Sequence, residues 1–297
     1  MKKFIFMCIM ALFASTPFTL AQTALVIIAH GAPDKQWNMP VLSLEDEVRN
    51  ELNQRGLKEF TYVRVALMEF SQPSVASVIA DCKRQNIKQI YVLPLFIAPS
   101  SHSEEDIPNV LNIKYNHETR CSLKEEKTDI ADTDIHITVG PTLSYSDVIE
   151  DIISDRVKGM SKNPSCESLV LMAHGDPDYR PFWEKLLKHT GEVAEKRIGV
   201  KFSGFAFIGM GQNFYHDFLP IATEAAKDKK SILVQGVYLS GGVKDIATYA
   251  LKDKAQEQYA DSLPKGISVV YDEQGLLPDS RISKWIADRA AEWVTNK

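Results

Sequence analysis

Several motifs that mark common classes of enzyme are missing from this chain of 297 residues. No stretch matches G-x-x-x-x-G-K-[ST], the loop that surrounds nucleotide phosphates, and none matches G-x-S-x-G, the turn that presents a nucleophilic serine. The zinc patterns C-x-x-C and H-E-x-x-H are absent as well. We therefore expect no nucleotide cofactor, no serine-hydrolase chemistry and no zinc site of those types.

Clustered positive charge is also missing. The chain has 34 lysines and arginines against 39 aspartates and glutamates, and its formal net charge is −5 at pH 7. A nucleic-acid partner would need a stripe of basic side chains to meet its phosphates. Beyond the first 21 residues, no apolar run is long enough to span a bilayer. We expect neither a nucleic-acid partner nor a membrane span.

Cysteine is scarce, and the first of the four cysteines, Cys8, lies within an apolar stretch at positions 4–14. Two lysines precede this stretch, and small and polar residues follow it as far as Ala21. The pattern predicts a signal peptide over residues 1–21 and a soluble mature protein exported to the periplasm. Because Cys8 lies inside the apolar stretch, a lipoprotein anchor is not expected. The other cysteines allow at most one internal bridge, and the sequence leaves the pairing and the oligomeric state open: Cys82, Cys121 and Cys166.

Segments with the pattern of buried strands alternate with segments of helical spacing. One predicted helix spans 43–55, where Leu44, Val48 and Leu52 recur at helical spacing between Ser43 and Gly56. Alternation of this kind is typical of a parallel sheet that is covered by helices on both faces. The predicted strands of the first half are 24–29, 62–67, 89–96 and 135–140, and the other predicted helices are 74–85 and 146–157.

The second half of the sequence repeats the first. ALVIIAHGAPD at 24–34 matches SLVLMAHGDPD at 168–178, and LPLFIAPSSHSEEDI at 93–107 is echoed by QGVYLSGGVKDI at 235–246. The first half carries an extra polar stretch, 112–134, which we interpret as a surface excursion. The sequence therefore predicts an α/β fold of two tandem, duplicated, doubly wound domains with parallel sheets. Their predicted ranges are 22–160 and 161–297.

Three side chains with ligand chemistry follow three predicted strands of the first half. His30 follows the first strand, Glu69 the second and His102 the third. In open α/β sheets, ligands bind beyond the carboxyl ends of the strands. Two imidazoles and a carboxylate suit Co²⁺, Ni²⁺, Fe²⁺ or Zn²⁺ better than Ca²⁺ or Mg²⁺. Each residue alone is more often a solvated side chain or a helix cap, but their joint placement predicts a site.

His102 has a setting that pulls its pKa in two directions. We expect Ser103 to cap the following helix, whose positive N-terminal end would disfavour a protonated imidazole. Glu104, Glu105 and Asp106 act the other way. The sequence does not rank the two effects. The three acids could be outer-shell partners of the metal site, but we favour the interpretation that they are favourable charges of the first helical turn.

The strand-end segments resemble one known family. AHGAP, LMEFSQPS and VLPLFIAPSSHSEEDIP are similar to the corresponding segments of the sirohydrochlorin chelatases, which are class II, ATP-independent chelatases. The pattern of Phe96, His102, Asp106 and Ile107 is the more specific part of this resemblance. It implies a chelatase-like, flavodoxin-related fold shared with ferrochelatase. Two features depart from the family: serine is usual at the position of Ala32, and most members lack an export signal.

The resemblance implies a function and a set of roles. His30 and His102 take the place of the metal-binding histidines and Glu69 that of a nearby acid, so all three are the expected catalytic residues. The implied reaction inserts a divalent metal, Co²⁺ foremost with Ni²⁺ or Fe²⁺ possible, into a tetrapyrrole such as sirohydrochlorin without a nucleotide. The alternative is an exported tetrapyrrole- or metal-binding protein that delivers its cargo without turnover. The residues expected to contact the substrate are Gly31, Ser100, Ser101 and Lys244. Lys244 is included on its own chemistry, because its ammonium could face the acidic side chains of a polycarboxylate tetrapyrrole, and a solvated surface lysine is the alternative.

The second half keeps only part of this set. His174 matches His30, Gly209 stands at the position of Glu69, and the shortened third loop offers Lys244 instead of His102. A lysine ammonium has no lone pair with which to bind a metal ion. We therefore predict a single catalytic site, in the first half, with the second half serving as a wall and scaffold.

Overall fold

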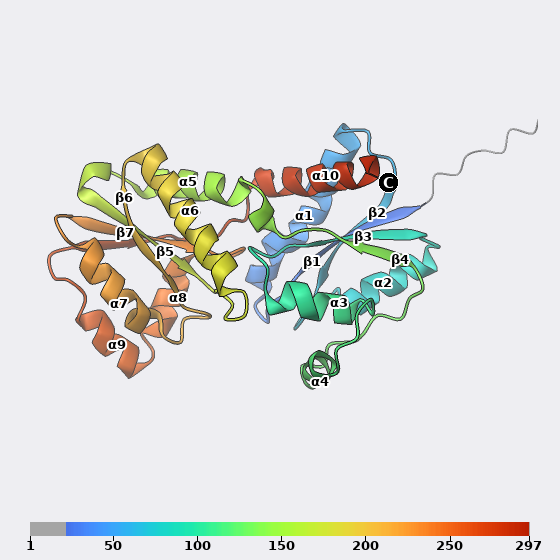
Figure 1. Cartoon of the computed structure of the whole chain (residues 1–297), viewed down its shortest axis with the longest axis horizontal. Helices are drawn as coiled ribbons and strands as arrows, with labels where there is room; N and C mark the ends of the chain where they lie inside the picture. The colour runs from blue at the N-terminus through green and yellow to red at the C-terminus, as the bar shows by residue number, and fades with distance from the viewer. Residues whose placement is uncertain (1–21, 297) are drawn as a thin grey trace, which may run out of the picture.

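Two four-stranded parallel sheets lie next to each other along the longest axis of the molecule (Figure 1). They come from a computed structural model of the chain, which describes residues 22–296. The strand orders are β2-β1-β3-β4 and β6-β5-β7-β8, so the second sheet repeats the topology of the first. The signal peptide predicted over residues 1–21 lies outside the described residues. Among the described residues, no helix has both the length and the apolar character needed to cross a membrane.

The first sheet is built from strands that alternate with helices along the chain. All its strand pairs are parallel. The strands are β1 (Thr23–Ala29), β2 (Phe60–Leu67), β3 (Gln89–Pro94) and β4 (His136–Val139). The helical segments up to the second sheet are α1 (Lys35–Gln54), α2 (Val75–Arg84), η1 (His102–Asp106), α3 (Ile107–Val110), α4 (His117–Glu125), η2 (Leu143–Tyr145), α5 (Val148–Met160) and η3 (Pro164–Cys166).

The second sheet has the same alternation of strands and helices. Its strand pairs are parallel too. The strands are β5 (Glu167–Ala173), β6 (Lys201–Phe207), β7 (Ser231–Val237) and β8 (Ser268–Tyr271). The helices are α6 (Arg180–Ile198), α7 (Phe214–Ala225), α8 (Val243–Ala250), α9 (Lys254–Asp261) and α10 (Ser280–Thr295). The predicted α/β class with two parallel sheets is confirmed.

The central strand β1 explains why both faces of the first sheet are covered. All seven of its residues are buried, and successive side chains point to opposite faces of the sheet. Leu25 and Ile27 join one hydrophobic cluster, whereas Val26 and Ile28 join another. A strand with no polar face requires helices on both sides, which is the doubly wound arrangement that the continuous apolar run predicts.

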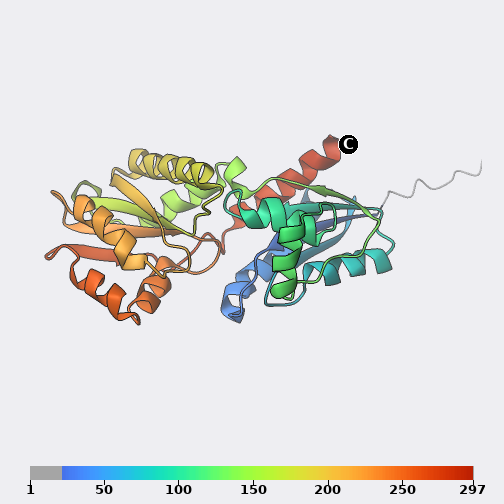
Figure 2. The ribbon, with the colours of Figure 1, turned by 60° about the horizontal axis from the view of Figure 1, so that its bottom comes forward.

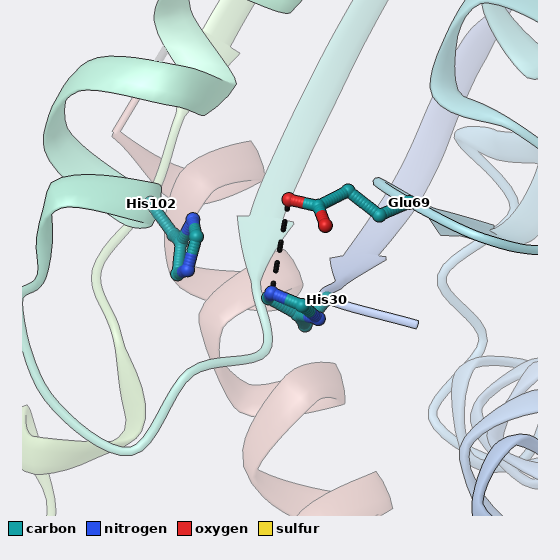
Figure 3. A group of neighbouring side chains, drawn as sticks. All are labelled: His30, Glu69 and His102. Carbon is teal, nitrogen blue, oxygen red and sulfur yellow. Dashed lines mark ion pairs between the residues drawn. The ribbon is translucent and has the colours of Figure 1, made fainter. Parts of the chain in front are cut away.

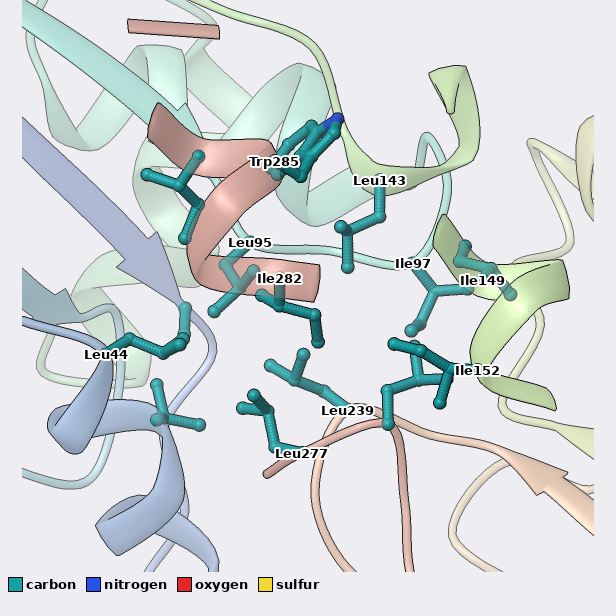
Figure 4. Close-up of a cluster of buried hydrophobic side chains, with 14 of the residues drawn as sticks. Leu44, Leu95, Ile97, Leu143, Ile149, Ile152, Leu239, Leu277, Ile282 and Trp285 are labelled. Carbon is teal, nitrogen blue, oxygen red and sulfur yellow. The ribbon is translucent and has the colours of Figure 1, made fainter. Parts of the chain in front are cut away.

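The last helix of each half packs against the other half. Helix α5 contacts α6 and β7 of the second half, and α10 contacts α1 and β3 of the first. In Figure 2, α10 extends from the centre of the molecule over the first half. One hydrophobic cluster runs through the junction, and Figure 4 shows Leu95, Ile152, Leu277 and Ile282 from both halves meeting there. In space, therefore, each half of the repeat carries the final helix of the other.

Some predicted elements differ from those observed. Helix α1 begins at Lys35 instead of Ser43, because the side chain of Asp34 accepts a hydrogen bond from the backbone of Gln36 and caps an earlier turn. Pro40 lies within this helix. The excursion at 112–134 contains helix α4, which stands apart from both sheets in Figure 1. The three cysteines within the described residues are all free thiols: Cys82, Cys121 and Cys166.

Candidate metal-binding site at the strand ends

Three neighbouring strands of the first sheet end beside one another and bring three predicted residues together. His30 follows β1, Glu69 comes two residues after β2, and His102 lies in the loop region after β3 (Figure 3). One ligand atom from each side chain can be chosen so that all three atoms lie within 4.8 Å of one another. The two imidazole rings meet edge to face, with their centroids 4.6 Å apart. The arrangement predicted from the sequence is the one observed.

Gly31 allows the first two loops to approach closely. Its φ is +91°, in the left-handed region, and a Cβ at this position would collide with the backbone carbonyl of Glu69. The backbone N–H of Glu69 donates to the carbonyl of His30 at 2.9 Å. The glycine therefore sets the spacing between the His30 and Glu69 backbones. A contact between Gly31 and a substrate, as predicted, remains a prediction.

Asn38, in the first turn of α1, links the same two loops by hydrogen bonds. This buried side chain accepts a hydrogen bond from the N–H of Ala32 at 2.9 Å and donates one to its carbonyl at 2.8 Å. It also donates to the hydroxyl of Ser71 at 3.1 Å. Sequence reasoning missed Asn38, because the predicted helix began only at Ser43 and no local pattern marks this polar residue as buried.

His30 presents a lone pair to the cluster. Its Nδ1 lies 2.8 Å from the carbonyl oxygen of Gly31, which can only accept, so Nδ1 carries the proton and Nε2 is free to bind a cation. Burial lowers the pKa of His30 below the ordinary histidine value, the bond to Gly31 opposes this, and the positive charge of protonated His102 lowers the pKa further. The neutral, metal-binding form of His30 is therefore favoured.

His102 begins a short π-helical segment instead of preceding an α-helix capped by Ser103. The N–H of Ile107 donates to the carbonyl of His102, five residues earlier, and Ser103 does not cap the segment. The Ser103 hydroxyl donates instead to the carbonyl of Ser100 at 3.2 Å. The cap predicted from the sequence is wrong, because the chain is already helical at Ser101 and the serine is buried against the preceding turn.

Asp106 holds the imidazole of His102. The His102 Nδ1 lies 2.7 Å from Oδ2 of Asp106, so Nδ1–H donates to the carboxylate and Nε2 is left for the cluster. Burial alone would lower the pKa of His102, but the bond to Asp106 and the nearby carboxylates, among them Glu69, outweigh it and raise the pKa. Our interpretation of Asp106 as a mere first-turn charge is therefore wrong. The sequence signal for its role was the spacing of four residues from His102.

Part of the polar stretch at 112–134 lies next to this site. Helix α4 contacts η1, and the charge of Glu126 at the end of α4 helps to raise the pKa of His102. Burial, together with the charges of Glu69 and Asp106, raises the pKa of Glu126 itself. The polar stretch that we interpreted as a simple surface excursion thus adds negative charge beside the histidines.

The second half holds the loop that carries His102. The backbone N–H and the hydroxyl of Ser101 both donate to Oδ2 of Asp176, at 2.9 and 3.1 Å. The indole N–H of Trp183 donates to the carbonyl of Pro99 at 3.0 Å. Asp176 follows His174 in the repeated AHGDP motif. Sequence reasoning missed these residues, because both contacts join positions more than 70 residues apart.

The residues predicted to bind substrate have other partners in this structure. Ser101 is bonded to Asp176, and the hydroxyl of Ser100 accepts a hydrogen bond from the backbone of Ser103. Lys244 lies at the start of α8 and forms an exposed ion pair with Glu273 at 2.5 Å. A substrate contact of Ser100, Ser101 or Lys244 remains a prediction.

The corresponding edge of the second sheet keeps the backbone but lacks two of the three donors. The N–H of Gly209 donates to the carbonyl of His174 at 3.2 Å, as that of Glu69 does to His30. His174 also places its Nδ1 2.8 Å from the following glycine carbonyl. Among the described residues, His174 belongs to no group of three or more possible metal ligands. Its charge nevertheless contributes to lowering the pKa of His30.

The chain is similar to several known proteins. A family model described as CbiX matches residues 24–160. A protein named sirohydrochlorin cobaltochelatase from Methanocaldococcus jannaschii is 31% identical over 147 residues, which cover 46% of this chain and 98% of the relative. Two solved structures of SirB from Bacillus subtilis share the fold. The complex with cobalt has a TM-score of 0.54 at 14% identity and covers 93% of this chain and 96% of its own. The complex with Fe³⁺ has a TM-score of 0.57 at 14% identity, with 91% and 95% covered.

Proposed function

Because the chain belongs to the CbiX family of metal chelatases, we propose that it inserts a divalent metal ion into sirohydrochlorin. Co²⁺ is the expected metal, and Ni²⁺ and Fe²⁺ are the alternatives. The metal is a substrate in this reaction, so a suitable site must bind it and then release it to the ring nitrogens. The observation that carries the proposal is the cluster of His30, Glu69 and His102, with all three ligand atoms within 4.8 Å.

The spacing of the cluster suits a metal ion held by few ligands. The Nε2 of His30 and Oε1 of Glu69 are 3.7 Å apart, too far for a hydrogen bond (dashed line in Figure 3). Two ligand atoms on a tetrahedral ion at about 2.1 Å each would be about 3.4 Å apart. A small inward movement of the side chains would therefore close the site on an ion, and three protein ligands leave a position open for a ring nitrogen.

The pKa values of the two histidines shift in opposite directions, which suits these residues to different roles in the reaction. Insertion places one divalent ion in the ring and releases two pyrrole N–H protons, so charge balances without a nucleotide. His30 stays neutral and suits the role of metal ligand. His102 has the raised pKa, and its bond to Asp106 stabilises the imidazolium form, so it is the better proton acceptor once the metal has left it.

The proposal also places this activity outside the cytoplasm. It rests on the signal peptide predicted over residues 1–21. Fractionation of cells that make the full-length chain is the test, and recovery of the uncleaved protein in the cytoplasm would contradict this part of the proposal alone.

The decisive experiment follows the absorbance of sirohydrochlorin after addition of Co²⁺ and the purified chain without residues 1–21. We expect many turnovers per protein molecule and a rate that rises in proportion to the protein concentration. Parallel reactions with Ni²⁺ and Fe²⁺ rank the metals. A rate equal to the protein-free control would exclude the enzyme. A spectral change that stops at one equivalent of protein would instead identify a binding and delivery protein.

A further inference from the structure

A hollow lies on the α5 face of the second sheet, and its lining residues are distant in sequence from the histidines of the metal cluster. Its volume is about 680 Å³, within the usual range of small-molecule sites. Helix α5 contributes Arg156, Gly159 and Met160 to its wall, and the sheet contributes Gln235 and Asp272. None of these residues takes part in the metal cluster.

The two halves can be compared residue by residue at this place. Gly140 and Asp272 are equivalent, because each follows the edge strand of its sheet and donates its N–H to the neighbouring strand at the same register. Leu93 and Gln235 are equivalent as well, since each pairs with the matching residue of its central strand. The first half thus has a leucine and a glycine where the second has an amide and a carboxylate.

Aromatic rings fill this position in the first half. The ring of Tyr91 stacks on Trp293 of α10, with 5.0 Å between centroids and 10° between planes. A Cβ at Gly140 would collide with the Tyr91 hydroxyl, so the ring occupies the space that the equivalent carboxylate takes in the second half. Helix α5 ends at Met160 and offers no indole. The second half therefore has polar groups and open space where the first has packed rings.

One polar atom of the hollow has no hydrogen-bond partner. The side chain of Gln235 is completely buried, and its Nε2 donates to Oδ2 of Asp272 and to the carbonyl of Gly236. The Asp272 carboxylate also accepts N–H bonds from Gly236 at 3.1 Å and Val243 at 2.6 Å. The carboxylate is thus well satisfied, whereas Oε1 of Gln235 is unpaired among the described residues. A buried amide oxygen requires a donor.

Charged side chains also line the hollow: Arg156, Asp155, Asp272 and Glu273. Arg156 donates from Nη2 to the carbonyl of Pro278 at 3.2 Å, and its buried Nε has no partner among the described residues. An unpaired Nε also occurs at Arg289 of α10, so the amide, rather than the guanidinium, distinguishes this half. Burial raises the pKa of Asp272 to about 7, although its backbone hydrogen bonds oppose the shift.

We propose that this hollow binds a small amino acid. The amino group of the ligand donates to Oε1 of Gln235 beside the Asp272 carboxyl, and the ligand carboxylate accepts from Arg156. A donor and an acceptor in one small molecule complete the groups that the protein leaves unpaired. Because Arg156 belongs to α5 and the other two residues belong to the second sheet, the ligand would bridge the exchanged helix and that sheet. This proposal does not depend on the metal chemistry of the first half.

The test uses calorimetric titration of the chain without residues 1–21. Glycine and the other common amino acids are the probes, and acetate and methylamine each carry one of the two required groups. We expect at least one amino acid to bind, and acetate and methylamine to bind at least about tenfold more weakly, because each leaves one protein group unpaired.

Two variants place the binding in this hollow. Gln235→Leu introduces the residue found at the equivalent position of the first half and removes the unpaired oxygen. Gly159→Leu adds a bulky side chain to the α5 wall of the hollow, at a position where a Cβ meets no atom within 4 Å. Each variant should weaken the amino acid at least about tenfold. Both should insert metal at the rate of the unsubstituted chain.

Two results would overturn the proposal. If no amino acid gives a binding signal at millimolar concentration, the hollow holds water only. If an amino acid binds equally well to the unsubstituted chain and to Gly159→Leu, it binds elsewhere on the protein. An unchanged circular dichroism spectrum in both variants shows that they are folded, whether or not the chain inserts metal, so a loss of binding is not caused by unfolding.

Discussion

The carboxyl edges of the two sheets have the same backbone and different chemistry. In both, a histidine follows the central strand, and its Nδ1 is hydrogen-bonded to the carbonyl of the next residue. The backbone carbonyl of each histidine accepts an N–H bond from the neighbouring loop. The first edge adds Glu69 and His102 to its histidine, whereas the second has Gly209 and an exposed lysine. The two copies of the scaffold therefore share a backbone geometry although only one carries the cluster of three possible metal ligands among the described residues.

The second edge has a different task, which is to support the first. Asp176 occupies the position of Ala32 in the repeat, and it receives two hydrogen bonds from Ser101, the residue before His102. Trp183 holds Pro99 in the same loop. In our proposal the two halves therefore differ in role: one edge binds the reactants, and the other fixes a loop of its neighbour.

The largest expected effect is the difference between substituting a histidine of the first edge and a histidine of the second. His102→Ala removes a ligand and the proton acceptor, and we expect the rate of metal insertion to fall by about a thousandfold. His174→Ala should leave the rate within about twofold, because this histidine belongs to no group of three possible metal ligands among the described residues. The absorbance assay with sirohydrochlorin and Co²⁺ measures both. Similar losses in the two variants would mean that the second edge also takes part in the reaction.

The next effect concerns pH, since protons and metal compete for the same lone pairs. The pKa of His102 is raised, so as the pH falls this residue is protonated first, above the ordinary histidine value. Below that point Co²⁺ affinity should fall about tenfold per pH unit, steepening to about a hundredfold once His30, whose pKa is lowered, is protonated as well. Calorimetry from about pH 5 to 8 records the profile.

Asp106→Asn is the matched variant for this profile. It keeps the shape of the side chain but removes the charge that raises the pKa of His102. The onset of the loss of Co²⁺ affinity should move to lower pH. An unchanged onset would mean that His102 is not the group that competes with the metal, and a flat profile would exclude both histidines as ligands.

The third comparison concerns the C-terminal ends of the two exchanged helices, α10 and α5, and their contributions to the free energy of unfolding. Trp293→Ala removes the ring that stacks on Tyr91, and we expect the free energy of unfolding to fall by about 2 kcal/mol. Met160→Ala, beside the open hollow of the other half, should cost less than about 1 kcal/mol. Urea unfolding followed by circular dichroism measures both. Equal losses would show that α5 is packed as tightly at its end as α10.

Local patterns were sufficient to predict the strands, the repeat and the three donors. Continuous apolar runs mark buried parallel strands, and residues directly after such strands must meet at one edge of the sheet. The exchange of α5 and α10, the position of Asn38 and the bond from Ser101 to Asp176 were not predicted. Each depends on contacts between segments that are distant in sequence or on burial that no local pattern encodes. The π-helical start at His102 was missed for a related reason, because serine before a helical segment usually indicates a cap.

The smallest effect tests the supporting role of the second edge. Asp176→Ala removes the acceptor for both Ser101 hydrogen bonds, so the loop that carries His102 loses a fixed point without losing any metal ligand. A misplacement of catalytic groups lowers the rate at the reacting centre more than it weakens binding. We expect kcat to fall about tenfold while KM for sirohydrochlorin changes less than about twofold.

The control for this prediction is Asp176→Asn, whose side-chain oxygen can still accept from Ser101 although the charge is gone. If Asp176 acts by holding the loop, the asparagine variant should recover most of the lost kcat, because the backbone N–H and the hydroxyl keep a shared acceptor. If its charge acts on the metal or the substrate instead, asparagine should be as poor as alanine and KM should rise with the loss of charge. A full rate in Asp176→Ala would show that the loop is held without this contact, and that the degenerate edge has no part in positioning His102.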